Sequence, residues 1–71
     1  MRKFTEKYYA NASSAQLEQD KSELIGINEI CQQYIDANKS SFLGCLSMKG
    51  EKKKNERIIA RINAELERRS R

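Results

Sequence analysis

Apolar side chains recur every three or four residues between positions 17 and 35, and this spacing predicts a long amphipathic helix. A heptad frame over this stretch places one broad apolar stripe on the helix, which consists of Leu17, Leu24, Ile27, Ile30, Cys31, Tyr34 and Ile35. Asp20 falls at a core position of the same frame and interrupts the stripe, and Ile25 lies off it. The width of the stripe is typical of a helix that packs one face against a core.

Capping residues predict where this helix begins and ends. Ser13, followed three residues later by Gln16, matches a capping box, and Asn38 is a suitable C-terminal stop. Gly26 lies in the middle, where glycine costs about 1 kcal/mol relative to alanine, so a break into two shorter helices is an open alternative. We favour a single helix over residues 13–38.

A second apolar stripe near the C-terminal end predicts a helix over residues 55–70. Its members are Ile58, Ile59, Ile62 and Leu66. Asn55 is the expected N-cap, with Glu56 in the first turn. The lysines at positions 52–54 would be unfavourable in a first turn, because they would face the positive end of the helix dipole. We therefore expect them in an exposed loop before the helix.

The segment between these helices, residues 39–54, reads as a connector that is first apolar and then rich in lysine. Its apolar part is either a short buried helix or an adhesive surface. Residues 1–12, which carry Phe4, Tyr8 and Tyr9, are either frayed or docked on the core. The sequence thus predicts an all-α protein with a single domain over residues 1–71, built as a two-helix hairpin. Because two arms bury one seam, we expect self-association, as a homodimer, into a helical bundle.

Composition excludes several functional classes. The chain has 71 residues and no histidine, so the commonest general base and metal ligand are missing. Cys31 and Cys45 are too few for a disulfide scaffold and lack the spacing of a structural zinc site. We therefore expect no enzyme activity, no catalytic residues, no metal site and no cofactor.

Without a secretory signal or a long apolar run, a soluble cytoplasmic protein with reduced thiols is expected.

Charge is distributed unevenly along the chain. Residues 1–38 carry four basic and six acidic side chains, whereas residues 39–71 carry ten basic and four acidic ones. Glu65 is spaced four residues from both Arg61 and Arg69, which predicts ion pairs on a solvated helix face. The acidic first arm and the basic second arm of the hairpin would partly neutralise each other.

The first functional hypothesis is a small regulator, inhibitor or adaptor that binds a protein partner stoichiometrically. Its contact surface is expected to comprise Phe42, Leu43, Leu46 and Met48. Contiguous exposed apolar residues with a charged rim are typical of interaction sites. The neighbouring lysines would steer a partner with an acidic surface.

The alternative is a basic regulator that binds nucleic acid. Its expected contacts are Lys52, Lys53, Lys54, Arg57, Arg61, Arg68 and Arg69. The segment 27–47 weakly resembles a helix-turn-helix motif, with residues 29–34 in the first helix and residues 40–47 in the recognition helix. We expect no membrane partner, because the apolar face of the last helix is narrow and lacks an aromatic anchor.

Overall fold

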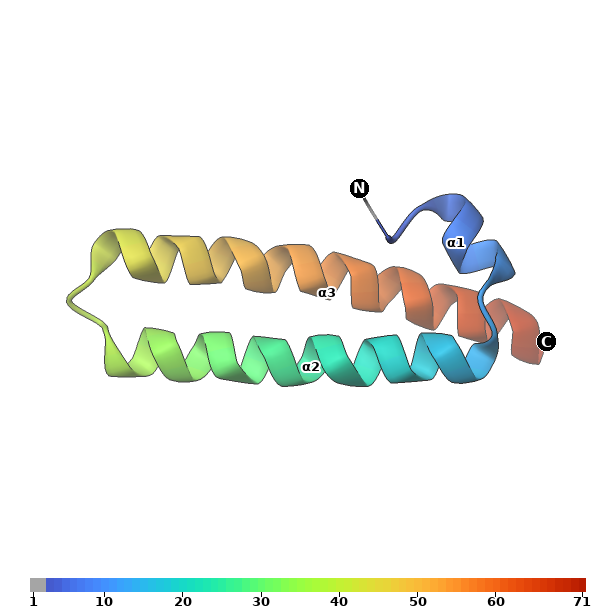
Figure 1. The fold of residues 1–71 in the computed structure, drawn as a ribbon, viewed down its shortest axis with the longest axis horizontal. Coiled ribbons are helices and arrows are strands. Elements are labelled where there is room, and N and C mark those ends of the chain that lie inside the picture. Colours follow the sequence, from blue (N-terminus) through green and yellow to red (C-terminus); the bar gives the residue numbers. More distant parts are fainter. Residues whose placement is uncertain (1–2) are drawn as a thin grey trace.

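The computed structural model describes residues 3–71, and within this range the chain is all-helical. It forms α1 (Glu6–Asn11), α2 (Ser14–Ala37) and α3 (Phe42–Ser70). Figure 1 shows α2 and α3 side by side and antiparallel, joined at one end by a short loop. The short α1 lies against α3 near the opposite end. The molecule is elongated, with extents of 46 × 21 × 16 Å, and the predicted all-α class is confirmed.

Helix α2 begins and ends at the residues that its capping pattern predicts. The Ser13 hydroxyl accepts a hydrogen bond from the Gln16 backbone N–H at 3.1 Å. At the other end, the Asn38 backbone N–H and side-chain amide both donate to the Tyr34 carbonyl. Gly26 lies inside the helix without interrupting it. The alternative of two shorter helices is therefore wrong.

The expected connector over residues 39–54 is also wrong. Helix α3 begins at Phe42 and continues unbroken, so residues 38–41 join the two long helices. The lysines at positions 52–54 lie well inside α3, where the dipole at the helix end has little effect on them. Asn55, the predicted N-cap, is an interior residue of the helix.

Contacts with α2 stabilise the first half of α3, although its glycines weaken it locally. The Cys45 thiol donates to the Asn38 carbonyl at 3.0 Å. The Tyr34 ring lies against Gly44, where a Cβ would come within 2.6 Å of the tyrosine oxygen, so glycine permits this close approach. These contacts form only when the two helices pack together, and the residues next to each other in the sequence do not predict that packing. Cys45 and Cys31 are both buried, and both are free thiols.

A pair of amides links the middles of the two long helices. The Asn55 side chain is buried, and its Nδ2 donates to the side-chain oxygen Oδ1 of Asn28 at 2.9 Å. A buried amide is costly unless it is hydrogen-bonded. The bond therefore favours the one alignment of α2 and α3 that brings the two amides together.

The apolar core is concentrated at the α1 end of the molecule. Its buried members are Tyr9, Leu17, Leu24 and Ile62, and partly buried side chains from α1, from the residues that flank it and from α3 surround them. Phe4 and Tyr8 are among these, so residues 3–12 are docked; residues 1 and 2 of the predicted segment lie outside the described residues. Towards the loop, Ile27, Ile30 and Tyr34 of the predicted stripe remain exposed.

Candidate interaction surface

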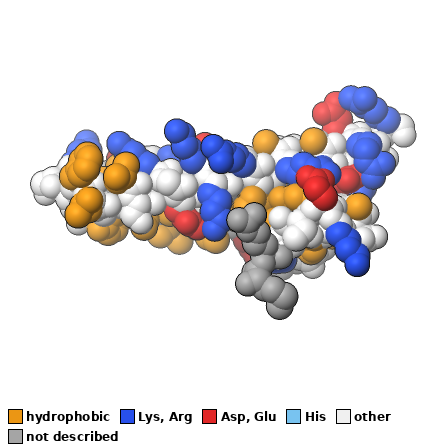
Figure 2. Space-filling model, turned by 90° about the horizontal axis from the view of Figure 1, so that it is seen from above, with side chains coloured by type: hydrophobic (Ala, Val, Ile, Leu, Met, Phe, Trp, Pro, Cys, Tyr) orange, Lys and Arg blue, Asp and Glu red, His pale blue; other side chains and the backbone are white. Residues whose placement is uncertain are grey.

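Three large apolar side chains are exposed where α3 begins. The exposed fractions are 74% for Phe42, 77% for Leu43 and 55% for Leu46. We refer to these three residues as the end patch. Figure 2 shows hydrophobic side chains gathered at the loop end of the molecule. The fourth predicted contact, Met48, is half-buried and does not share this exposure.

A second apolar surface lies on α2. Ile27, Ile30 and Tyr34 are spaced by three and four residues and therefore share one face of the helix. Ile30 is the most exposed of them, at 66%. We refer to these residues as the α2 stripe. It belongs to α2 and the end patch to α3, and the Tyr34 ring lies against Gly44 beside the end patch.

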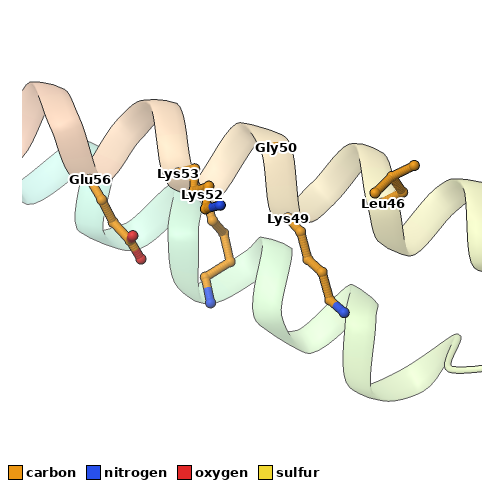
Figure 3. A pocket seen from close by; sticks show the side chains of 6 residues that line it. All are labelled: Leu46, Lys49, Gly50, Lys52, Lys53 and Glu56. Atoms are coloured by element: carbon orange, nitrogen blue, oxygen red, sulfur yellow. The ribbon is translucent and has the colours of Figure 1, made fainter.

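A shallow pocket continues from the end patch along α3 (Figure 3). We call it the lysine pocket, and it is lined by Leu46, Lys49, Gly50, Lys52, Lys53 and Glu56. The side chains of Lys49, Lys52 and Glu56 leave successive turns of α3 on the same side. Lys52 also reaches α2, where its ammonium group donates to the Gln32 side-chain oxygen at 2.6 Å. The pocket thus combines an apolar end with a mainly cationic wall.

The predicted nucleic-acid contacts divide into two groups. Lys53, Lys54 and Arg57 are exposed on the middle of α3. Arg61, by contrast, forms an ion pair with Glu6 at 2.6 Å. The last two predicted arginines, at positions 68 and 69, also interact within the chain, as described next.

Glu65 organises the arginines at the end of α3. Its side chain is only 3% exposed and accepts hydrogen bonds from Arg68 at 2.7 Å and from Arg69 at 3.4 Å. The prediction of a solvated face is therefore wrong for Glu65. Arg69 also donates to the Tyr9 carbonyl at 2.9 Å, which ties the end of α3 to α1. The hydrogen bond from Arg68 outweighs desolvation and lowers the pKa of Glu65.

Asp20 forms a buried polar network that we did not predict. Its side chain, 1% exposed, accepts hydrogen bonds from Lys3 at 3.0 Å, from Gln16 at 2.9 Å and from the Tyr8 hydroxyl. Burial alone would raise the pKa of Asp20, but the hydrogen bonds from Tyr8, Lys3 and Gln16 outweigh it and lower that pKa. The carboxylate thereby connects the N-terminal segment to α2. The available sequence signal was its charged side chain at a core position of the heptad frame.

The helix-turn-helix arrangement suggested for residues 27–47 is not found. In that motif two helices cross at about 90–120°. Here α2 and α3 lie side by side and antiparallel, and the supposed recognition helix at 40–47 forms the loop end and the first turns of the long α3. No short helix projects from the pair in this segment. The predicted recognition helix at 40–47 is therefore wrong.

Comparisons with models of protein families, with curated proteins and with solved structures find no match. Across residues 3–71, none of the helices has the length and apolar character needed to cross a membrane. Over the same range, no three His, Cys, Asp or Glu side chains are grouped as a metal site requires. Functional interpretation therefore starts from the geometry and charge of the surface.

Proposed function

We propose that this protein is a small non-enzymatic regulator that acts stoichiometrically by binding a protein partner through its end patch. The observation that carries the proposal is the exposure of Phe42, Leu43 and Leu46 together at the start of α3. Large apolar residues clustered on a surface favour burial against another protein. An aromatic side chain such as Phe42 is also well suited to anchor an interface.

Charge beside the end patch supports a partner with an acidic surface. Lys49 and Lys53 are exposed on the turns of α3 that follow Leu46. Cations around an apolar contact accelerate encounter with an acidic partner and disfavour basic ones. The end patch would supply affinity, and the lysines would supply rate and selectivity.

Replacing Phe42 and Leu46 together by serine is expected to weaken partner binding about a hundredfold or more. Each side chain contributes about 1.5–3 kcal/mol when it is fully buried, and about 1.4 kcal/mol corresponds to a factor of ten. Helix content should not change, because both side chains are exposed in the free protein. The measurement is proximity cross-linking with quantitative mass spectrometry, alongside circular dichroism.

The matched control is Ile25→Ser, which changes an exposed apolar residue of α2 outside both apolar surfaces. It should retain the cross-linked partner. An unchanged partner profile for the Phe42→Ser, Leu46→Ser variant would remove the end patch as the contact.

We also propose that two copies associate through the α2 stripe into a helical bundle. Four packed helices would cover the apolar side chains that one pair of helices leaves exposed. Ile30→Glu is expected to shift the protein to a monomer in sedimentation equilibrium, because it places a charge in the middle of the contact. Sedimentation of the unchanged protein as a monomer at high concentration would contradict this proposal.

The alternative function is nucleic-acid binding through Lys52, Lys53, Lys54 and Arg57. The exposed cations on the middle of α3 favour it. This contact surface is smaller than the one that the sequence predicts, because Arg61, Arg68 and Arg69 interact within the chain. Such binding would weaken steeply with salt.

A further inference from the structure

We propose that the lysine pocket receives an acidic amphipathic helix of the partner protein. One apolar side chain of that helix would enter over Gly50 beside Leu46, and its carboxylates would pair with Lys49 and Lys53. This inference rests on the proposed function, since it names the chemistry of the same partner.

Gly50 provides the space for the incoming side chain. A glycine inside a helix costs about 1 kcal/mol relative to alanine. At Gly44 the close approach of Tyr34 explains the glycine. A Cβ built on Gly50, by contrast, meets no other heavy atom of the described residues within 4 Å, beyond its chain neighbours and the nearby backbone of its own helix. Leu46, Gly50 and Lys53 are spaced by four and three residues and so share one face of α3. The missing side chain deepens the surface between an apolar and a cationic neighbour.

The shape of the pocket fits a helix. Its lining residues run from Leu46 to Glu56 along α3, a rise of about 15 Å. Partner helices dock in such grooves with apolar residues that recur at each turn. Phe42 and Leu43, beyond one end of the pocket, would contact the next apolar residue of the same incoming helix.

The apolar part of the lining favours an acidic helix over nucleic acid. The lining has three lysines and one glutamate, so it attracts carboxylates and phosphates alike. Leu46 and the rest of the end patch, however, offer apolar contacts that a phosphate backbone cannot use. An amphipathic acidic helix satisfies the apolar and the cationic parts together.

Fluorescence anisotropy with a labelled peptide tests this inference. The probe is a synthetic peptide of about 15 residues, with leucines spaced by three and four and glutamates between them. A second peptide carries glutamine in place of every glutamate. The full-length protein is expected to bind the acidic peptide saturably and at least tenfold more tightly than the glutamine peptide. Equal affinity for both peptides, or no saturable binding of the acidic one, would overturn the inference.

Gly50→Leu and Gly26→Leu form a matched pair of variants. Both glycines are helical and have open space at the Cβ position among the described residues, but Gly50 lines the pocket and Gly26 lies on α2. Leucine favours helix at either position, so both variants should fold. Gly50→Leu is expected to weaken peptide binding at least tenfold, and Gly26→Leu to leave it unchanged. Equal effects of the two substitutions would overturn the assignment of the pocket.

Three further measurements distinguish the other possible occupants of the pocket and separate this inference from the proposed function. Tighter binding of a single-stranded oligonucleotide than of the acidic peptide would assign the lysines to nucleic acid and overturn the inference. If the protein is a dimer and Gly50→Leu converts it to a monomer, the pocket binds a second copy of the chain, which would also overturn the inference. If the Phe42→Ser, Leu46→Ser variant loses the cellular partner but Gly50→Leu retains it, this inference fails while the proposed function stands.

Discussion

Leu17→Ala or Ile62→Ala is expected to lower the free energy of unfolding by about 2–5 kcal/mol. Both side chains are 0% exposed, and they belong to the buried cluster that joins α2 and α3. A domain of this size rarely has more than about 3–5 kcal/mol of net stability from its core. Either substitution should therefore leave much of the protein unfolded at room temperature, as measured by urea denaturation followed by circular dichroism.

Ile30→Ala is the control for this comparison. Ile30 belongs to the same predicted stripe as Leu17 but is largely exposed in the single chain. At protein concentrations too low for the proposed dimer to form, its loss should therefore change stability by no more than about 0.5 kcal/mol. A cost at Ile30 as large as that at Leu17 would mean that the core extends along the α2 stripe, in a dimer for example. Repeating the measurement at several protein concentrations distinguishes that case.

Asp20→Ala is expected to cost about 2–3 kcal/mol and to release the N-terminal segment. The substitution leaves the Tyr8 hydroxyl and the Gln16 amide without their acceptor, and hydrogen bonds to a charged group are worth about 1.5–3 kcal/mol. Amide hydrogen exchange should accelerate first at Tyr9, whose N–H donates to the carbonyl of Thr5, the N-cap of α1. Glu23→Ala, at an exposed site on the same helix, should leave that exchange unchanged. Unchanged exchange in Asp20→Ala would show that the apolar contacts alone dock α1.

The same variant is expected to change the response to acid. The folded state lowers the pKa of Asp20 from an ordinary value of 3.8, so the unfolded chain takes up the proton first as the pH falls. The contribution of Asp20 is complete above about pH 5 and is lost as the pH falls through 3.8 towards the lowered pKa. The folded state also lowers the pKa of Glu65 from its ordinary value of 4.5, so its contribution to stability is likewise lost as the pH falls. Asp20→Ala should therefore lose less stability than the unchanged protein between about pH 5 and pH 3.

Local signals in the sequence predicted α2 but not the start of α3. Ser13 and Asn38 act within one turn of the helix that they cap, so their roles can be read from neighbouring residues. The first half of α3 has two glycines and a run of lysines, which locally favour a loop. Its helical state depends on contacts with α2, such as Asn55 with Asn28, and these follow from the fold.

The apolar residues of the candidate surface were visible in the sequence, but their division into faces was not. Because α3 begins at Phe42, its first two turns place Cys45 on the face towards α2 and leave Leu43 and Leu46 exposed to solvent. Met48 is half-buried for the same reason. The lysine pocket could not be predicted at all, because residues placed in an irregular connector have no common face.

The amide pair between Asn28 and Asn55 contributes to how far the end patch projects. Sliding α3 by one turn, about 5.4 Å, towards the N-terminal end of α2 would place Asn55 opposite Leu24 and leave a buried amide without a partner. The slide would also draw Phe42 and Leu46 back along α2. One hydrogen bond in the middle of the molecule thus helps to fix the position of a surface at its tip. A change at either asparagine is therefore expected to alter partner binding, although neither residue belongs to the end patch.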